Sequence, residues 1–268
     1  MLVLKWKACR RRCRSGWINA KVKVVKRNFL YCFFLAVLIA PLARATPSID
    51  IGSMYEYMSM SKQFLVKPVW NRGSSTAYIK VTPVEIFFDE GGKEYTSNDK
   101  ADGDAIKKKD GLLASPSHLI VPAKGRATVR LVHIGKREQE RYYRIGFNPV
   151  VPQTQDEFKL DEAAAEQYQQ SFKAGVTVLA GYGAILIVRP LSTHFDTRIE
   201  QRDGQHIIRN NGNSTVLLQY FKACREQQCS GEQLIHLRPG QSKLVPKDGQ
   251  HYRFTLKEGE QSRPFDLH

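Results

Sequence analysis

Residues 174–190, AGVTVLAGYGAILIVRP, form an apolar stretch with no charged side chain between Lys173 and Arg189. The Val, Ile, Thr and Tyr residues of this stretch favour extended chain, and its three glycines disfavour a helix. Large apolar side chains lie on one alternating face in its first half and on both faces in its second half. This pattern predicts one long strand that is half-buried at its start and fully buried at its end.

Such a strand needs a cover, because an apolar face exposed to water promotes aggregation. Two interpretations stay open: an ordinary core strand of one domain, and a strand whose first half is covered by a partner. A membrane helix is disfavoured, since about fifteen uncharged residues fall below the roughly 20 that a span needs. We therefore expect no stable membrane insertion.

From residue 48 onward, short extended runs alternate with turn signals. The first run is Ile49 to Met58. The next two, Phe64 to Trp70 and Thr76 to Phe88, flank an Asn-Arg-Gly-Ser-Ser segment and predict a hairpin; a polar surface loop is expected over 89–111. Further strands are expected at residues 119–121, 128–134, 142–151, 198–200, 206–209, 215–221, 234–237, 243–245 and 252–256. Short strands with frequent turns predict β-sandwiches.

A polar, acidic segment at residues 153–173 interrupts the strand pattern. We interpret it as a long mobile loop before the apolar strand. A short surface helix, which Asp161 could cap, is the alternative.

The strand pattern changes after Pro190, where a second and smaller all-β unit begins. The two units share an echo: residues 119–125 (LIVPAKG) and 236–242 (HLRPGQS) both run from a strand through Pro and a small residue towards the next strand. We expect an all-β chain with one domain at 46–190 and a smaller one at 191–268.

Charge is concentrated in residues 1–45, which hold eleven of the 41 Lys and Arg residues and no acidic residue. The net charge of +15 therefore falls to +4 over the rest of the chain, with 30 basic and 26 acidic residues, and it indicates no nucleic-acid partner. A basic region, the apolar run Phe29 to Ile39 and small residues at Ala43 and Ala45 follow the pattern of a secretory signal cleaved after Ala45. An uncleaved anchor is the alternative.

Two cysteines, Cys224 and Cys229, remain once the leader is removed. Four intervening residues can close a small loop, and an exported protein meets an oxidising compartment, so we predict a disulfide. A metal site is the alternative, but two thiolates with no histidine nearby in sequence are too few ligands.

Catalytic motifs are absent from the sequence: it has no G-x-S-x-G, H-E-x-x-H, phosphate-loop or dinucleotide fingerprint. The seven histidines are scattered through predicted strands and turns, and we expect surface or edge residues rather than ligands. The prediction is therefore a binding protein without metal or cofactor, and not an enzyme.

The order of these features resembles the periplasmic chaperones of the chaperone–usher pilus pathway. Residues 119–131 (LIVPAKGRATVRL) are similar to the family's turn and strand in the first domain. Ser115-Pro116 stands where the family usually has a Thr/Ser-Pro bond, often cis. Residues 140–145 (ERYYRI) resemble the next strand, and residues 184–190 (AILIVRP) resemble the end of the long strand called G1.

The second domain is similar to that of the divergent alternate branch, which serves colonisation-factor and common-pilus types. The similarity rests on residues 210–215 (NNGNST) and on the Cys224/Cys229 loop. The resemblance covers nearly all of the mature chain. It implies two immunoglobulin-like β-sandwich domains in tandem, after a cleaved signal peptide, in the periplasm.

What the resemblance implies for function is donor-strand complementation. A pilus subunit is an immunoglobulin-like sandwich that lacks its last strand, and the chaperone's G1 strand fills the open groove. By register, the subunit-binding side chains are Val176, Val178 and Ala180, with Tyr182 as a further candidate. The implied partners are pilus subunits and an outer-membrane usher.

The sequence departs from the better-known branch at the carboxylate anchor. That branch holds the subunit's C-terminal carboxylate with an Arg on the first strand and a Lys on G1, whereas here Ile185 stands at the Lys position and residues 49–60 contain no Arg. The candidates are Arg144, Lys67 and Arg189. Arg144 comes first, because an Arg within an apolar strand needs an anionic or polar partner. An outer-face position or an interdomain ion pair is the alternative for Arg144, and Arg189 fits an interdomain ion pair better than the anchor.

Two further questions stay open at this point. The competing function is a structural pilus subunit or adhesin, which would carry its own donor extension near the mature N-terminus. The free form is either a monomer or an oligomer that caps its own G1 strand.

Overall fold

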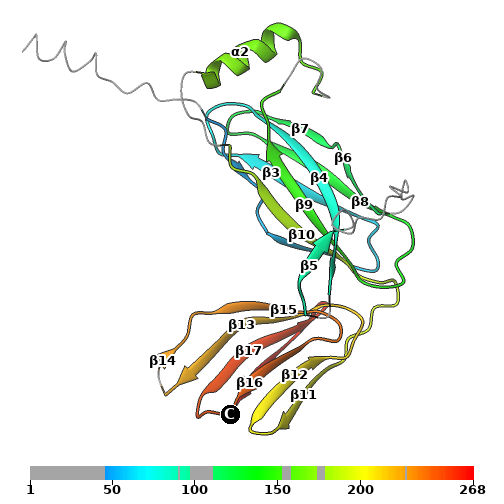
Figure 1. Cartoon of the computed structure of the whole chain (residues 1–268), viewed down its shortest axis with the longest axis vertical. Helices are drawn as coiled ribbons and strands as arrows, with labels where there is room; N and C mark the ends of the chain where they lie inside the picture. Colours follow the sequence, from blue (N-terminus) through cyan, green and yellow to red (C-terminus); the bar gives the residue numbers. More distant parts are fainter. Residues whose placement is uncertain (1–45, 90, 97–110, 153–157, 174–178, 227) are drawn as a thin grey trace, which may run out of the picture. The chain divides into compact units, whose positions relative to one another are not determined.

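The computed structural model describes residues 46–89, 91–96, 111–152, 158–173, 179–226 and 228–268, with side chains of the last helical turn (171–173) left aside. The expected signal peptide at 1–45 lies outside these residues. The described chain is almost entirely β-structure, as the sequence predicts (Figure 1).

Two facing sheets arise from the first part of the chain. One has the strand order β1-β3-β8-β6; the other has the order β2-β10-β9-β4-β5, with β7 also paired to β4. The bounds are β1 Ile49–Asp50, β2 Tyr55–Met58, β3 Phe64–Asn71, β4 Ala77–Phe88, β5 Glu94–Thr96, β6 Gly111–Ser115, β7 His118–Val121, β8 Arg126–Ile134, β9 Arg141–Pro149 and β10 Tyr182–Val188.

Alternation along the strands builds the core between these sheets. In β9, the side chains of Tyr143, Ile145 and Phe147 are buried, while Arg144 and Asn148 point to solvent. The buried side chains of both sheets form one continuous apolar cluster. Because successive side chains of a strand point to opposite faces, each strand has one solvent-exposed face and one buried face, as in other β-sandwiches.

The predicted hairpin between residues 64–70 and 76–88 is wrong. β3 pairs with β1 and β8 in one sheet, whereas β4 pairs with β9, β5 and β7 in the other, so the chain crosses between sheets at the intervening turn. Gly73 is required there, because a Cβ at this position would overlap the backbone of Thr46 and Ser48.

The first predicted run, Ile49 to Met58, is also divided between the sheets. β1 pairs with β3, and β2 pairs with β10. The crossing is made at Gly52, whose φ of 65° is readily adopted only by glycine.

The polar segments contain more structure than the sequence suggests. The loop expected at 89–111 contains β5, paired to β4. The loop expected at 153–173 contains helix α2, Glu162–Lys173, so the helical alternative is correct. The Asp161 side chain caps this helix, because its Oδ1 accepts a hydrogen bond of 2.7 Å from the Ala164 N–H.

Residues from 197 onward form the second sandwich, with its own apolar cluster. One sheet has the order β11-β12-β16; the other has β14-β13-β17-β18, with β15 paired to β13. The bounds are β11 Thr197–Arg202, β12 Gln205–Asn210, β13 Val216–Arg225, β14 Gln228–Cys229, β15 Gln233–Leu237, β16 Ser242–Pro246, β17 His251–Glu258 and β18 Gln261–Leu267. The sequence interpretation missed β14 and β18. The predicted division at 190/191 falls between β10 and β11 and stays a prediction.

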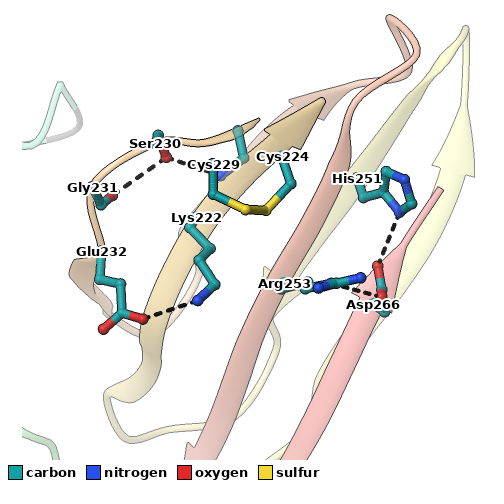
Figure 2. Close-up of a disulfide and its surroundings, with 10 residues drawn as sticks. Lys222, Cys224, Cys229, Ser230, Gly231, Glu232, His251, Arg253 and Asp266 are labelled. Carbon is teal, nitrogen blue, oxygen red and sulfur yellow. Dashed lines mark hydrogen bonds and ion pairs between the residues drawn. A yellow bond between two sulfur atoms is a disulfide. The ribbon is translucent and has the colours of Figure 1, made fainter. Parts of the chain in front are cut away.

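Two local predictions are confirmed. Cys224 and Cys229 form a disulfide on the β13–β14 ladder (Figure 2). The Ser115–Pro116 peptide bond is cis. Among the described residues, no helix is long and apolar enough to cross a membrane.

Candidate functional site

β10 is paired unequally on its two edges. β9 runs antiparallel to it along its whole length, from Tyr182 to Val188. β2 runs parallel to it only from Ile185 onward, and the first of these contacts is the Ile185 N–H to Met54 carbonyl bond of 2.8 Å. Within the part of the chain that the structure describes, no strand pairs with the other edge of residues 182–184. This edge is therefore available to a strand from another molecule.

The faces of β10 follow the predicted alternation. Ala184, Leu186 and Val188 are buried in the apolar cluster of the first sandwich, and Tyr182 packs against it. Ile185 lies on the opposite, half-buried face. The face of the even-numbered residues is therefore the face of the core, and the second half of the apolar stretch is buried as predicted.

The first half of the apolar stretch is only partly described. Val176 and Val178 lie outside the described residues. Residues 179–181 are described, and none of them is in a strand. Ala180 and Gly181 are exposed, and Leu179 is half-buried. The predicted strand therefore begins at Tyr182 in this structure, which corrects the expectation for residues 179–181.

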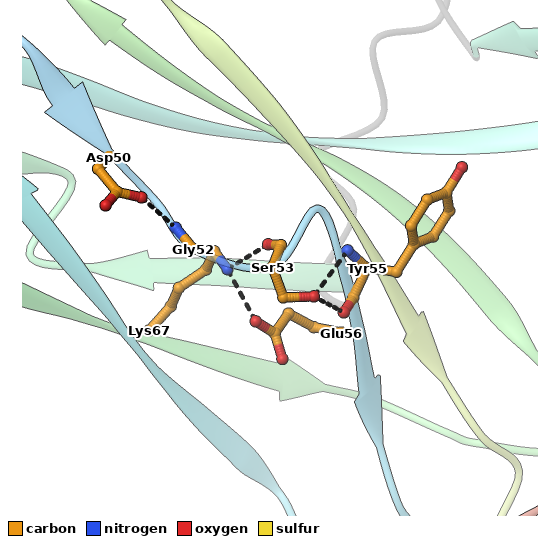
Figure 3. A network of polar contacts seen from close by, with 6 residues as sticks. All are labelled: Asp50, Gly52, Ser53, Tyr55, Glu56 and Lys67. Carbon is orange, nitrogen blue, oxygen red and sulfur yellow. Dashed lines mark hydrogen bonds and ion pairs between the residues drawn. The ribbon is translucent and has the colours of Figure 1, made fainter. Parts of the chain in front are cut away.

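A buried lysine fixes the edge strand β2. The Lys67 side chain is 1% exposed, and its Nζ atom donates to the Ser53 carbonyl and to Glu56 Oε1, both at 2.7 Å (Figure 3). These two residues lie at the crossing from β1 and on β2 itself. The ammonium group thereby holds the start of β2 against the sandwich, and Lys67 is a structural residue in this state rather than a free anchor.

A buried arginine fixes the other end of the β2–β10 pair. Arg137, 7% exposed, donates hydrogen bonds to the carbonyls of Met58, Ser59, Lys62 and Arg189. These are the carbonyl groups where the two parallel strands end. The position of β2 beside β10 is therefore set by a basic side chain at each end.

The three anchor candidates lie apart from one another. Arg144 is on the outer face of β9, half-exposed, with its Nη2 2.6 Å from Glu94 Oε1. Arg189 is 8% exposed, and its guanidinium group lies over the rings of Tyr57 and Phe195, 5.2 Å from each centroid. The outer-face alternative for Arg144 is thus what the geometry shows, while its role in binding stays a prediction.

Arg189 borders a cleft of about 460 Å³ that runs along β2. Two further basic side chains, Lys62 and Lys257, line the same cleft, together with Tyr57 and His236. Arg189 Nε is buried and makes no hydrogen bond among the described residues. These three basic groups outnumber Glu260, the acidic side chain that also lines the cleft, so the cleft is a suitable place for an anion.

His236 closes one wall of this cleft. Its Nδ1 is hydrogen-bonded to the Tyr57 hydroxyl at 2.7 Å, and its ring stacks on Tyr55 with centroids 4.0 Å apart. Burial lowers the pKa of His236 to about 4, so the ring is neutral at neutral pH. Burial likewise raises the pKa of the Tyr57 hydroxyl, which stays protonated and can donate.

Glu140 joins the first sandwich to the start of β13. Its carboxylate accepts hydrogen bonds from the Thr215 N–H at 2.8 Å, from the Ser214 hydroxyl at 2.6 Å, and from the Tyr142 hydroxyl. Burial and the neighbouring Glu140 carboxylate raise the pKa of Tyr142. The two β-sandwiches are therefore connected by a satisfied polar network in addition to the linker.

Sequence reasoning missed Arg137, Glu140 and Glu56. Arg137 and Glu140 lie in the charged run KREQER, where nothing distinguishes a buried charge from a solvated one. The sequence does contain one hint for Glu56, because it is the only acidic residue between Asp50 and Glu85. In the fold it forms an ion pair with Lys67.

Comparisons with known proteins agree with this architecture. No protein-family model matches the chain. The probable fimbrial chaperone EcpB of Escherichia coli (strain SMS-3-5 / SECEC) is 27% identical over 216 residues, which are 78% of this chain and 85% of the relative. The protein of the same description from Escherichia coli O157:H7 (strain EC4115 / EHEC) is 26% identical over 220 residues, or 80% and 87% of the two chains.

Solved structures share the fold. The class 5 fimbriae chaperone CfaA is 19% identical, with a TM-score of 0.51 over 82% of this chain and 99% of CfaA. The Escherichia coli chaperone DraB is 11% identical, with a TM-score of 0.51 over 83% and 98% of the two chains. In its sequence relatives, its two sandwiches and the incompletely paired β10, the chain is similar to the fimbrial chaperones of the chaperone–usher pathway.

Proposed function

We propose that this protein binds and stabilises pilus subunits by lending them a strand, and delivers them to an outer-membrane usher. The observation that carries the proposal is the edge of β10 that faces away from β9: β2 covers it only from Ile185 onward, so no described strand pairs with this edge of residues 182–184, at the described end of an apolar segment. A subunit that lacks its last strand can pair with such an edge and receive alternating side chains in its open core.

The register of β10 selects the donor side chains. Ala184, Leu186 and Val188 point into the chaperone's own core. The same face, continued back along the chain with a period of two, contains Tyr182, Ala180, Val178 and Val176. Burial of each valine in a subunit groove contributes roughly 1.5–3 kcal/mol before the cost of ordering the segment. The small Ala180 side chain fills its pocket only shallowly.

The subunit's C-terminal carboxylate is proposed to bind in the cleft beside β2. Of the candidates Arg144, Lys67 and Arg189, only Arg189 borders this cleft, and Lys62 and Lys257 add two more positive charges. Lys67 is already paired with Glu56, and Arg144 with Glu94. The geometry therefore favours Arg189 as the anchor, whereas the sequence placed Arg144 first.

The setting follows from the family. Fimbrial chaperones are periplasmic and act by binding rather than by catalysis, and we propose the same for this chain. The predicted signal peptide and the disulfide agree with an oxidising compartment. The alternative of a structural subunit or adhesin is not favoured by the relatives. The co-purification that identifies the partner also shows whether the free form is a monomer or an oligomer that caps its own donor strand.

The test is co-purification from a periplasm that also expresses the subunits encoded beside this protein. Wild type should retain a partner of one-sandwich size in a 1:1 complex, and that partner should become insoluble without it. Val178→Asp should lose the partner, because a carboxylate cannot enter an apolar groove. Thr177→Asp, on the other face of the segment, should retain it.

Circular dichroism must show the same folded spectrum for both variants. Retention of the partner by Val178→Asp would contradict the donor-strand assignment. Recovery of the wild type alone or as long self-polymers would favour the structural-subunit alternative. For the anchor, Lys257→Ala should weaken subunit capture more than Arg144→Ala; the reverse order would return Arg144 to first place.

A further inference from the structure

The hairpin of β17 and β18 places three metal-binding side chains together on the second sandwich. The two strands pair with Tyr252 opposite Leu267 and Arg253 opposite Asp266. One step further in this register puts His251 opposite His268. Residues 251, 253, 266 and 268 therefore share one face of the hairpin, since alternate residues of a strand point the same way.

The ligand atoms on this face lie at metal-binding separations. Asp266 Oδ1 is 3.7 Å from His251 Nδ1 and 3.5 Å from His268 Nε2, and the three atoms all lie within 4.8 Å of one another. Zinc bonds of 2.0–2.1 Å at tetrahedral angles separate two ligand atoms by roughly 3.3 Å. The two separations at the carboxylate need to shrink by only a few tenths of an ångström, and the two imidazole nitrogens, which lie within 4.8 Å of each other, approach further by side-chain rotation.

His251 has an unsatisfied nitrogen that faces this cluster. Its Nδ1 atom is buried and makes no hydrogen bond among the described residues. A buried polar atom without a partner is costly, and a metal ion would satisfy it. The Asp266 carboxylate is divided between two roles (Figure 2): Oδ2 accepts from Arg253 Nε at 2.9 Å, while Oδ1 points towards the His251 imidazole.

A residue from the other sheet supports the third ligand. His206 on β12 has its Nε2 2.9 Å from the backbone carbonyl of His268. This contact holds the chain that follows β18 against β12. The cluster is therefore fixed from two sheets.

We propose that His251, Asp266 and His268 form a binding site for a divalent transition-metal ion, with Zn²⁺ as the reference ion. Two imidazole nitrogens and one carboxylate oxygen suit Zn²⁺, Cu²⁺ or Ni²⁺, whereas Mg²⁺ and Ca²⁺ prefer oxygen ligands alone. Three protein ligands leave a fourth position for water or for a group from another molecule. The bound ion would tie β17 to β18 at the open end of their hairpin.

The test is calorimetric titration with ZnCl₂ of the mature protein, purified without a polyhistidine tag and treated with EDTA. Wild type should bind one Zn²⁺ per chain, its melting temperature should rise with Zn²⁺, and Mg²⁺ should do neither. His251→Ala and His268→Ala should each weaken binding by about tenfold or more. His194→Ala, an exposed histidine in the segment just before the second sandwich, is the control and should bind like wild type.

A fourth variant moves the affinity the other way. Arg253→Gln removes the positive charge beside Asp266 and should tighten Zn²⁺ binding several-fold. Equal titrations for wild type, His251→Ala and His268→Ala would overturn the site, as would the absence of one-to-one binding in wild type. An unchanged or weaker affinity in Arg253→Gln would contradict Asp266 as a ligand.

Discussion

Asn71 and Asn210 make the same hydrogen bonds at equivalent corners of the two sandwiches. In each, the side-chain amide N–H group donates to the carbonyl of the serine four residues later and to the carbonyl at the end of a strand, and the amide oxygen accepts from the glycine two residues later. For Asn71, the bonds measure 2.7 Å to Ser75, 3.0 Å to Val121 and 2.9 Å from Gly73. For Asn210, they measure 2.9 Å to Ser214, 2.8 Å to Leu237 and 3.0 Å from Gly212.

Asn210→Ala should therefore destabilise the second sandwich by about 2–3 kcal/mol, because it leaves buried backbone groups without partners. Asn210 is 0% exposed, so water cannot replace the amide. Urea unfolding measures the loss. Asn211→Ala, an exposed neighbour in the same turn, should change stability by no more than about 0.5 kcal/mol; equal effects of the two substitutions would show that the amide bonds do not stabilise the corner.

These corners explain how far the sequence could predict the fold. The echo between residues 119–125 and 236–242 marks the segment that packs against each asparagine: Asn71 N–H bonds to the Gly125 carbonyl, and Asn210 N–H to the Gln241 carbonyl. A repeated turn sequence thus indicated a repeated corner. Strand positions and the disulfide were predictable for the same reason, since they follow from local alternation and spacing.

Pairing between strands was less predictable. The Asn-Arg-Gly turn after β3 has hairpin composition, yet its residues direct the chain into the other sheet, because Asn71 binds the end of β7 rather than closing a hairpin. Side-chain bonds to distant carbonyls leave no local signal. The same holds for the site: the core-facing side chains of β10 were predictable from alternation, whereas the roles of Lys67 and Arg137 depend on which carbonyls the fold brings to them.

The buried pair of Lys67 and Glu56 predicts an asymmetric response to mutation. Glu56→Gln should cost about 2–3 kcal/mol, because it leaves a buried ammonium group without its counter-ion. Lys67→Met should cost about 1 kcal/mol, because methionine fills apolar space and the Glu56 side chain, 25% exposed, can reach water. Urea unfolding of both single variants and the double variant checks this. Equal single costs that simply add would mean that the pair is not coupled.

Glu140 predicts that the two sandwiches unfold together. Glu140→Ala removes the acceptor for Ser214 and Thr215 and should separate one calorimetric transition into two. Glu138→Ala is the matched control, because that side chain is 77% exposed and its ion pair, at 3.4 Å, is with the also exposed Lys136. A single transition in Glu140→Ala, at the wild-type temperature, would mean that other contacts couple the sandwiches.

His236 predicts a loss of stability in mild acid. Its pKa in the folded protein is lowered by burial to about 4, below the ordinary value of 6.5 that it regains on unfolding. The unfolded chain therefore binds the proton first, so this contribution to stability is complete above about pH 6.5 and is lost as the pH falls towards 4. Between pH 7.5 and 5.5 the loss from this one residue should be about 1 kcal/mol.

Urea unfolding at pH 7.5 and 5.5 measures this loss. The free energy of unfolding should change between the two pH values by about 1 kcal/mol less in His236→Gln than in wild type. The amide oxygen of the glutamine can still accept a hydrogen bond from Tyr57. The other six histidines contribute equally to both proteins and cancel in the comparison. An identical pH dependence in wild type and His236→Gln would mean that the ring is protonated without cost beside Tyr57, and that the cleft along β2 tolerates another positive charge.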